Sequence, residues 1–462
     1  MSLETAMQQW REALGPRYAI DDPQQLRELG LTTFATRTRV VGLLRPANTA
    51  EVQALTRIAS DQGVPIYPIS RGRNWSYGSK VPTCEGAVVV DLGRMKRILD
   101  FDEDLAHVTV EPGVTQQQLY DFLRVRGSNL MMSVTGSSPD SSLIGNTVER
   151  GLAVGPLGDR FGNSCNFEVV LPTGHVVQTG YGRYPGARTG ELLRHAVGPA
   201  FEGLFTQSNF GIVTRMTMWL QPRPPYFQAV AATIRDREHL AIVVDEMRAL
   251  SQLGLLKGSF GFWNDYKMLA ALRQYPFDLT ESTPLPDFLR RRMTRRAGMG
   301  PWILVGALYS GSRRHGLAER ELVEERLRGH VDRLVFVDEL RAGVAKFISP
   351  FVEALTGEDL AANIDRLYGE SAFLGIPSSF PLRQLYWRRR GRIPDQPTPD
   401  SDGCGAIACS PTVPFRGRDV QEVTTIVDQL FERHGFEPNV TLICAGPRHI
   451  DMVVLVVYDR EV

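Results

Sequence analysis

The sequence predicts an α+β protein of two domains, and three observations support this prediction. Its 462 residues are about three times the common domain length of ~150 residues. Short apolar strands alternate with helices up to about residue 220, and longer β-like runs alternate with amphipathic helices beyond it. Between them, the QPRPP segment at 221–225 cannot be helical, because proline removes a donor and restricts its predecessor. We therefore expect a first domain over 1–223 and a second over 224–462.

The first domain opens with an α/β pattern. A helix is expected over Ala50–Gln62, followed by a short strand, a glycine-rich turn and a buried strand. The expected strands of this domain are Pro65–Ile69, Ala87–Leu92, Ala106–Glu111, Phe167–Pro172 and Val176–Gly180. Short strands and helices continue to alternate as far as the proline-rich boundary.

The second domain is expected to hold a mainly antiparallel sheet with helices beside it. Its expected strands are 228–234, 302–309, 441–445 and 453–458, and its expected helices are 237–253, 319–328 and 420–434. The stretch 394–411 is rich in Pro, Asp, Gly and Ser, which is typical of a loop.

Bulk composition excludes several classes of partner. Fifty-two basic residues balance fifty-two acidic ones, so the chain lacks the broad positive field that attracts nucleic acid or an anionic membrane. Five cysteines without a CxxC pair indicate neither a disulfide framework nor a structural zinc site. The N-terminus lacks a signal-peptide pattern, and no run approaches ~18 apolar residues. We expect a cytoplasmic protein that binds a small-molecule substrate and no metal.

A glycine-rich loop follows the expected strand Pro65–Ile69 and reads SRGRNWSYGS over residues 70–79. Gly72 and Gly78 let the backbone turn sharply and direct successive N–H groups at one anion, as a diphosphate requires. An ordinary turn is the alternative interpretation of the same residues. The loop matches neither GxxxxGK[ST] nor GxGxxG, so the common nucleotide loops do not account for it.

Two further segments sharpen the hypothesis of a cofactor site. Small residues gather at 136–138, 145–151 and 155–158, where they either flank an extended diphosphate and ring or form plain turns. A third segment, 198–214, offers a strand whose backbone could reach the edge of a ring.

In five ordered phrases the chain resembles the FAD-binding domain shared by p-cresol methylhydroxylase and vanillyl alcohol oxidase. The phrases are PISRGRNWSYGS, VEPGVT, GNTVERG, EVVLPTG and LFTQSNFGIVTRMTMWLQPRPP. The resemblance is dense over about residues 40–225 and thin from there to 462. It implies an FAD-binding first domain and a substrate-binding cap domain built on an antiparallel sheet.

The resemblance also assigns cofactor contacts. It implies that the diphosphate is held by Ser70, Arg71, Gly72, Arg73, Asn74, Trp75, Ser76, Gly78, Gly136 and Ser137. Gly145, Asn146 and Glu149 are expected along the ribityl and diphosphate region. Gly211, Ile212 and Val213 are expected beside the adenine or the ring system.

Two candidate catalytic residues lie in the first domain. In the family, the tyrosine at the position of Tyr77 projects toward the substrate and bonds a phenolic oxygen, whereas packing on the cofactor is the alternative. Asp140 lies six residues before Asn146, where relatives carry an acid near flavin N5, although the spacing here looks shorter. A carboxylate there could act as a base, and an exposed turn residue is the alternative.

The segment GPRHIDM, at 446–452, resembles the family's active-site strand RDMHH. Here the first of the paired histidines becomes Asp451, and His449 lies two positions earlier. Alternate residues of a strand share a face, so the two form a candidate acid–base pair. An exposed strand edge is the other interpretation.

These features favour an FAD-dependent oxidoreductase that transfers a hydride from a 4-alkylphenol or aryl alcohol to flavin N5 through a quinone methide. A hydroxy acid, a sugar or a biosynthetic intermediate is the alternative substrate, and an inactive flavin-fold subunit is a further alternative. Oxygen or an electron-transfer protein would accept the electrons, and the resemblance is compatible with a homodimer.

Two departures from the family shape these expectations. Residues 403–411 contain no histidine or tyrosine to tether FAD, so we expect non-covalent FAD, with a link to Cys404, Cys409 or Tyr386 as lesser options. Relatives continue with a helical return that carries a Tyr-Arg pair, whereas this sequence stops at Val462. Either the sequence given is truncated or the phenolate-binding pair is absent, and in the second case the substrate need not be a phenol.

Overall fold

The structure is a computed structural model that describes residues 2–78, 80–342 and 371–460. The chain divides into two compact units. Unit 1 is formed by Met1–Ala153, Asp159–Pro222 and Asp400–Asp402, and unit 2 by Val154–Gly158, Arg223–Pro399 and Gly403–Val462. Two short segments thus belong to a different unit from the residues on either side of them. Val154–Gly158 belongs to unit 2 and is flanked by unit 1, and Asp400–Asp402 belongs to unit 1 and is flanked by unit 2.

Unit 1 begins with a four-stranded sheet in the order β1-β2-β4-β3. Its strands are β1 (Ala19–Ile20), β2 (Gly42–Leu44), β3 (Ile66–Ile69) and β4 (Val88–Asp91), and its helices are α1 (Leu3–Leu14), α2 (Pro23–Leu29) and α3 (Thr49–Gln62). β4 pairs in parallel with β2 and β3 and carries the fully buried run Val88–Val90. Continuous apolar runs are typical of parallel strands covered on both faces.

Local residues set the ends of α3. The Asn48 side chain accepts the N–H of Glu51, and the Glu51 carboxylate accepts the N–H of Ala47 at 2.8 Å, so two exposed donors are satisfied. Gly63 ends the helix at φ 65°. Trp10 of α1 joins the two helices, because its indole N–H donates to the Leu55 carbonyl at 3.0 Å.

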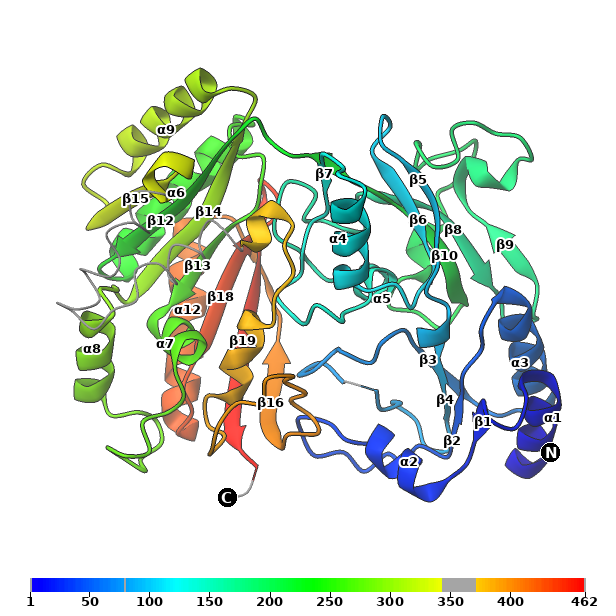
Figure 1. Ribbon diagram of the computed structural model, residues 1–462. Helices are drawn as coiled ribbons and strands as arrows, with labels where there is room; N and C mark the ends of the chain where they lie inside the picture. Colours follow the sequence, from blue (N-terminus) through cyan, green and yellow to red (C-terminus); the bar gives the residue numbers. More distant parts are fainter. Residues whose placement is uncertain (1, 79, 343–370, 461–462) are drawn as a thin grey trace. The chain divides into compact units, whose positions relative to one another are not determined.

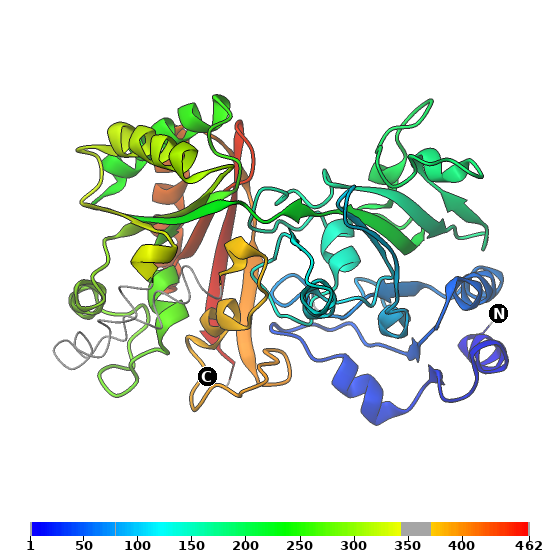
Figure 2. The same cartoon turned by 45° about the horizontal axis from the view of Figure 1, so that its top comes forward.

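A five-stranded antiparallel sheet completes unit 1, in the order β5-β6-β10-β8-β9 (Figure 2). Its strands are β5 (Ile98–Asp102), β6 (His107–Val110), β8 (Ser164–Val170), β9 (Val176–Gln178) and β10 (Ile212–Trp219). The remaining elements are α4 (Gln116–Val125), α5 (Leu143–Val148), the pair β7 (Leu130–Met131) and β11 (Gln221–Pro222), and the 3-10 turns η1 (Leu92–Arg94), η2 (Gly180–Arg183) and η3 (Glu202–Phe205).

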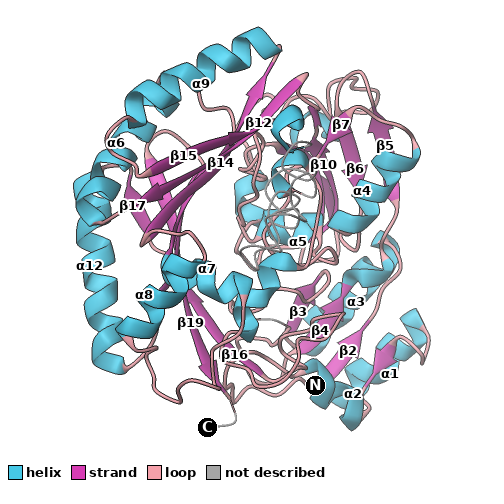
Figure 3. Cartoon of the chain, turned by 60° about the vertical axis from the view of Figure 1, so that its left-hand side comes forward, coloured by secondary structure: helices cyan, strands magenta, loops and turns pink. Residues whose placement is uncertain are grey.

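Unit 2 is built on one antiparallel sheet in the order β15-β12-β14-β13-β18-β19-β16, with β17 paired to β19 (Figure 1). Its strands are β12 (Tyr226–Ile234), β13 (Phe260–Asn264), β14 (Trp302–Ser310), β15 (Arg333–Val337), β16 (Cys404–Cys409), β17 (Thr412–Pro414), β18 (Asn439–Cys444) and β19 (His449–Asp459). Helices α6 (Arg237–Gln252), α9 (Arg313–Leu327) and α12 (Gly417–His434) cover one face and enclose the main core with it (Figure 3).

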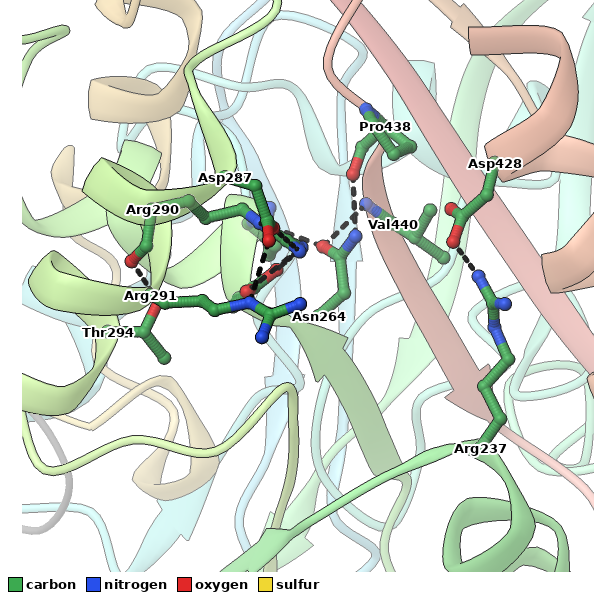
Figure 4. A network of polar contacts seen from close by, with 11 residues as sticks. Arg237, Asn264, Asp287, Arg290, Arg291, Thr294, Asp428, Pro438 and Val440 are labelled. Carbon is green, nitrogen blue, oxygen red and sulfur yellow. Dashed lines mark hydrogen bonds and ion pairs between the residues drawn. The ribbon is translucent and has the colours of Figure 1, made fainter. Parts of the chain in front are cut away.

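A polar network fastens α7 (Asp265–Leu272) to the sheet of unit 2 (Figure 4). The Asn264 side chain caps α7 by accepting the Lys267 N–H, and it also accepts the Val440 N–H and donates to the Pro438 carbonyl at 2.6 Å. Helix α8 (Asp287–Arg296) is tied to α7 because Arg290 contacts the buried Asp265 at 3.2 Å. The 3-10 turns η5 (Ala372–Leu374) and η6 (Phe380–Tyr386) complete the unit.

The structure confirms the expected α+β class with antiparallel sheets. The expectation of a loop over the whole of 394–411 is wrong, because Cys404–Cys409 forms β16 and pairs with β19. The glycine-rich composition that suggested a loop instead permits close pairing of the two strands. A Cβ at Gly405 would lie 2.4 Å from the Tyr458 carbonyl oxygen, so a small residue is required there. Helix α9 starts earlier than expected, because Ser312 caps it ahead of the polar run that follows. Over the described residues, no helix combines the length and apolar character that a membrane crossing requires.

Candidate functional site

The glycine-rich first loop leaves β3 and turns sharply at the expected positions. Gly72 has φ 61° and Gly78 φ 128°, backbone conformations that side-chain-bearing residues rarely adopt. A Cβ at position 72 would lie 2.3 Å from Cγ of Lys80, so only glycine leaves room for that side chain. Ser76 has φ 70° and donates its N–H to Thr33 Oγ1 at 3.1 Å. Residue 79 lies outside the described residues.

The second loop, residues 133–142, lies against the first loop. Ser142 caps α5 by accepting the Gly145 N–H at 2.8 Å. A Cβ at Gly145 would be 3.2 Å from Ser70 Oγ, so the first turn of α5 faces the start of the first loop. Arg73 also reaches Asp140, with 3.5 Å between Nη2 and Oδ2. Gly136 is exposed and Ser137 partly exposed in this loop.

The third segment joins the end of α5. Gln207 donates its backbone N–H to the Val148 carbonyl at 2.9 Å and its amide to the Glu149 carbonyl at 3.1 Å. Desolvation by the surrounding residues raises the pKa of Glu149, although the residue is exposed. Burial raises the pKa of the Tyr67 hydroxyl, and the negative charge of Glu149 raises it further. The first loop, residues 136–151 and the segment 198–214 therefore lie together in unit 1, whereas residues 154–158 pack with unit 2.

Gly211 has a packing role at the start of β10. A Cβ there would meet Val169 Cγ1 at 2.6 Å. Ile212 and Val213 follow as buried strand residues paired with Val170 and Val169. Their backbone pairs with β8 on one side, and β6 pairs with β10 only from Met216 onward.

Polar atoms within unit 1 test whether the loops fit FAD. Three buried atoms of the first loop have no protein partner: Arg71 Nε, Arg73 Nε and Trp75 Nε1. Asn146 Oδ1 on α5 is also buried and unpartnered. Buried polar groups normally have partners, so each of these atoms calls for one. Three donors and one amide suit a cofactor that carries a diphosphate and hydroxyl groups, and the residues present fit FAD. Asn74 is exposed at the turn of the loop.

Two residues that no sequence motif marks support the second loop. Gln116 is fully buried at the start of α4; it accepts the Thr135 N–H at 2.8 Å and donates to the Ser138 carbonyl at 3.1 Å. Arg160 donates to the same Gln116 oxygen at 2.8 Å. No spacing in the sequence marks either residue, because both act across distant parts of the chain.

The candidate catalytic residues of unit 1 lie near its surface. The Tyr77 side chain is 50% exposed, and the Asp140 carboxylate is half exposed with Arg73 as its partner. Tyr77 is therefore accessible to a ligand, and the Asp140 carboxylate faces the Arg73 guanidinium.

His449 and Asp451 share the face of β19 that is turned away from the main core. Ile450 and Met452 point the other way and are completely buried in that core. His449 Nε2 lies 3.5 Å from Asp451 Oδ2, and Thr412 Oγ1 donates to Asp451 Oδ1 at 3.3 Å. The histidine is 51% exposed and the aspartate 27%, so the pair remains open to a reaction partner.

The lesser candidates for a covalent link also lie in unit 2. Cys404 is buried at the start of β16, Cys409 is exposed at its end, and Tyr386 is completely buried in η6. A partly buried lysine without a sequence signal lies near η6. Lys267 of α7 donates to Gln384 Oε1, and burial lowers the pKa of Lys267 to about 7. Within the described parts of the chain it has no carboxylate at ion-pair distance.

Comparison with known proteins supplies the context for this geometry. The family model described as an FAD binding domain matches residues 41–180. The chain is 44% identical to the 1'-carboxy-chondrochloren decarboxylase of Chondromyces crocatus over 99% of this chain and 85% of that protein. It is 29% identical to the 4-cresol dehydrogenase [hydroxylating] flavoprotein subunit of Pseudomonas putida, over 89% of this chain and 72% of the relative. The solved 4-ethylphenol oxidase of Gulosibacter chungangensis, in complex with isoeugenol, superposes with a TM-score of 0.88 at 27% identity, covering 100% of this chain and 84% of that one.

Proposed function

Because the chain belongs to the vanillyl alcohol oxidase/p-cresol methylhydroxylase family of FAD-dependent oxidoreductases, we propose that it dehydrogenates a 4-alkylphenol or a related aryl alcohol at the benzylic carbon. The observation that supports this substrate class is the likeness, along nearly the whole chain, to two proteins named for para-alkylated phenols. The cofactor-loop geometry of unit 1 supports the redox half of the proposal.

The first and second loops, together with α5, would hold the cofactor. Arg71, Arg73 and Trp75 of the first loop and Asn146 of α5 would offer it their unpartnered buried polar atoms. When bound, FAD accepts a hydride at its N5 atom. The protein's own task is to place the substrate and to manage protons.

Tyr77 would bind the phenolic oxygen of the substrate. A hydroxyl positioned against that oxygen stabilises the phenolate, whose electrons push into the ring and favour loss of a hydride from the para benzylic carbon. The substrate then becomes a neutral quinone methide. The half-exposed side chain of Tyr77 is compatible with this role, since it is open to a ligand.

His449 and Asp451 would serve the proton steps that follow. A quinone methide takes up water at the benzylic carbon, and the water must lose a proton as it adds. An accessible imidazole 3.5 Å from a carboxylate suits this task, because the carboxylate stabilises the imidazolium that forms. Thr412 holds the carboxylate from its other oxygen.

A second candidate function is oxidative decarboxylation, which is favoured by the 44% identity to a protein named a decarboxylase. The first step is the same. If the carbon beside the benzylic carbon bears a carboxylate, the C–C bond to that carboxylate can break instead of water adding. Its electron pair then forms a new C=C bond, the phenolate is restored and CO2 leaves. No further oxidant is needed, so this function and phenol oxidation differ only in the fate of the quinone methide.

The electrons stored in one turnover must leave the protein. Oxygen or an electron-transfer protein is the proposed acceptor, and the relative named as a flavoprotein subunit supports the second option. A homodimer remains part of the proposal by analogy with the family.

The test is an anaerobic absorbance titration of the purified, yellow protein with three compounds. 4-Ethylphenol should bleach the flavin band if a 4-alkylphenol is the substrate class. 3-(4-Hydroxyphenyl)propanoate should bleach it and release CO2 with 4-vinylphenol if decarboxylation is the function. The 4-methoxy analogue of the propanoate cannot form a phenolate and should leave the flavin oxidised.

The outcomes separate the two functions and their alternatives. Bleaching by 4-ethylphenol alone supports simple oxidation, whereas CO2 release supports the decarboxylase. A protein that stays yellow with every phenol contradicts both proposals and points to a non-phenolic substrate. Acid precipitation of the same sample tests the non-covalent cofactor, because released FAD would colour the supernatant.

A further inference from the structure

Glu202 is a buried carboxylate without a partner among the described residues. It opens the 3-10 turn η3 of unit 1, and the residue is 1% exposed. Both carboxylate oxygens are buried and accept no hydrogen bond from the described chain. They also form no ion pair within 4.0 Å with a described lysine, arginine or histidine. Buried charges are normally paired or bound to a metal ion, so this carboxylate calls for a partner.

Two backbone carbonyls face the same space as Glu202, beside the Cα atom of Gly180. The position that a Cβ of Gly180 would take lies 3.7 Å from Glu202 Oε1, 3.7 Å from the Leu193 carbonyl oxygen and 3.8 Å from the Arg194 carbonyl oxygen. Apart from the chain neighbours of Gly180, these are the nearest heavy atoms to that position. Neither carbonyl accepts a hydrogen bond from a described residue. Three oxygen acceptors without donors therefore surround one space.

The arginines nearest to η3 are engaged elsewhere. The guanidinium groups of Arg150 and Arg194 lie over the Phe161 ring, 4.3 and 4.0 Å from its centroid. Arg150 also donates its Nε–H to Thr206 Oγ1 at 2.9 Å. A monovalent cation would balance the single charge of Glu202, whereas a divalent ion would bring an excess positive charge close to two arginines.

The type of donor atom identifies the class of ion. Carboxylate and backbone carbonyl oxygens suit hard cations, and transition metals prefer nitrogen and sulfur ligands. Over the described residues, no group of three His, Cys, Asp or Glu side chains gathers as a transition-metal site would require. We propose that Glu202 and the carbonyl oxygens of Leu193 and Arg194 bind a monovalent alkali cation, K⁺ or Na⁺, beside Gly180.

Such an ion would join segments that support the cofactor region. Glu202 belongs to η3, Gly180 begins η2, and the two carbonyls come from the loop between these turns. A few residues after η3, Gln207 bonds the carbonyls at the end of α5. Because the unfolded chain cannot assemble these ligands, the ion would stabilise the folded protein in proportion to its concentration. This inference does not depend on which substrate the enzyme oxidises.

The experiment measures thermal unfolding of the FAD-loaded protein in KCl, NaCl or CaCl2, with tetramethylammonium chloride holding the ionic strength constant. Glu202→Gln removes the charge at nearly equal size. Gly180→Ala places a methyl group in the space, at ordinary contact distance from the three oxygens. Glu12→Gln, on the exposed face of α1, is the control for the first variant. Gly63→Ala is the control for the second, because it has a similar positive φ and nothing within 4 Å of the added Cβ.

We expect the unfolding midpoint of the wild-type protein to rise by about 3–5 °C for each tenfold increase in KCl or NaCl above the Kd. Glu202→Gln and Gly180→Ala should lose this dependence, and both control variants should keep it. Crystals of the wild-type protein grown in RbCl should show an anomalous difference peak beside Glu202, because Rb⁺ can take the place of K⁺.

Four results would overturn the proposal. Equal wild-type midpoints in every salt would leave Glu202 to a buried water or to the nearby arginines. A response to CaCl2 without one to KCl or NaCl would contradict a monovalent ion. A dependence that persists in both site variants would place the ion elsewhere. If neither site variant folds, the RbCl crystals of the wild-type protein decide, and the absence of a peak beside Glu202 contradicts the site.

Discussion

The Lys80 ammonium lies 3.0 Å from the carboxylate of Asp400, and the Asp400 side chain is 1% exposed. Asp400 belongs to a three-residue segment that packs in unit 1, while the strand that follows, β16, belongs to unit 2. The stem of Lys80 also fills the space above Gly72 in the first loop. One ion pair therefore joins the expected diphosphate loop to a segment from the far end of the sequence.

Replacing Asp400 by Asn should destabilise unit 1, because it leaves the Lys80 ammonium buried without its partner. Removing one member of a buried pair costs about 3–5 kcal/mol, and the value here should lie near the lower end since Lys80 keeps some exposure. Urea unfolding followed by flavin fluorescence measures it. Asp395→Asn, which removes an ion pair exposed on both sides, is the control and should have no measurable effect. Equal stabilities for the two variants would contradict a structural role of the Lys80 pair.

Alanine at Gly72 should weaken FAD binding far more than alanine at Gly63. Both glycines adopt positive φ, so each substitution carries about 1–2 kcal/mol of backbone strain. At Gly63 nothing lies within 4 Å of the added Cβ, whereas at Gly72 the Cβ collides with Lys80. We expect the FAD Kd to rise at least about tenfold in Gly72→Ala alone. A similar Kd in both variants, measured by fluorescence titration of the apoprotein, would rule out this account of the loop.

Stability should depend on pH through Lys267. Its pKa in the folded chain is about 7, against about 10.4 for an unperturbed lysine. Between these values the unfolded chain binds more protons, so this group's contribution to stability rises with pH and is most unfavourable below pH 7. Lys267→Met should therefore stabilise the protein by about 2–3 kcal/mol more at pH 6 than at pH 9. Denaturant titrations at the two pH values check this, and a gain independent of pH would mean that the lysine does not titrate in this way.

The pair on β19 should control the proton steps of turnover. His449→Gln removes the proposed general base and is expected to slow product formation by about a hundredfold or more. Asp451→Asn should cause a smaller loss, since it only withdraws the charge that stabilises the imidazolium. His434→Gln, at the exposed end of α12, is the matched control. Rapid-mixing kinetics and product analysis distinguish the steps, and a His449→Gln enzyme with wild-type turnover would remove the pair from the mechanism.

Several elements could be predicted because their signals are local. The proline-rich segment, the apolar run of β4 and the amphipathic α6 and α12 follow from backbone chemistry and hydrophobic period, which neighbouring residues determine. The glycines of the first loop also carried their own signal, since positive φ is a requirement of single residues. Strand β16 escaped this reasoning, because its partner β19 is what makes a glycine- and alanine-rich stretch a strand.

The sequence by itself determined the α+β class and the glycine-rich turns, because glycine, proline and apolar period act over a few neighbouring residues, and the resemblance of five phrases identified the family. Only the tertiary structure decided which of those residues meet, such as Ser70 with Gly145, Arg73 with Asp140 and His449 with Asp451. It alone also revealed Arg160 as a buried charge and Lys80 and Lys267 as partly buried ones. The physical reason is that burial and pairing are properties of the space around a side chain, which segments distant in the sequence create.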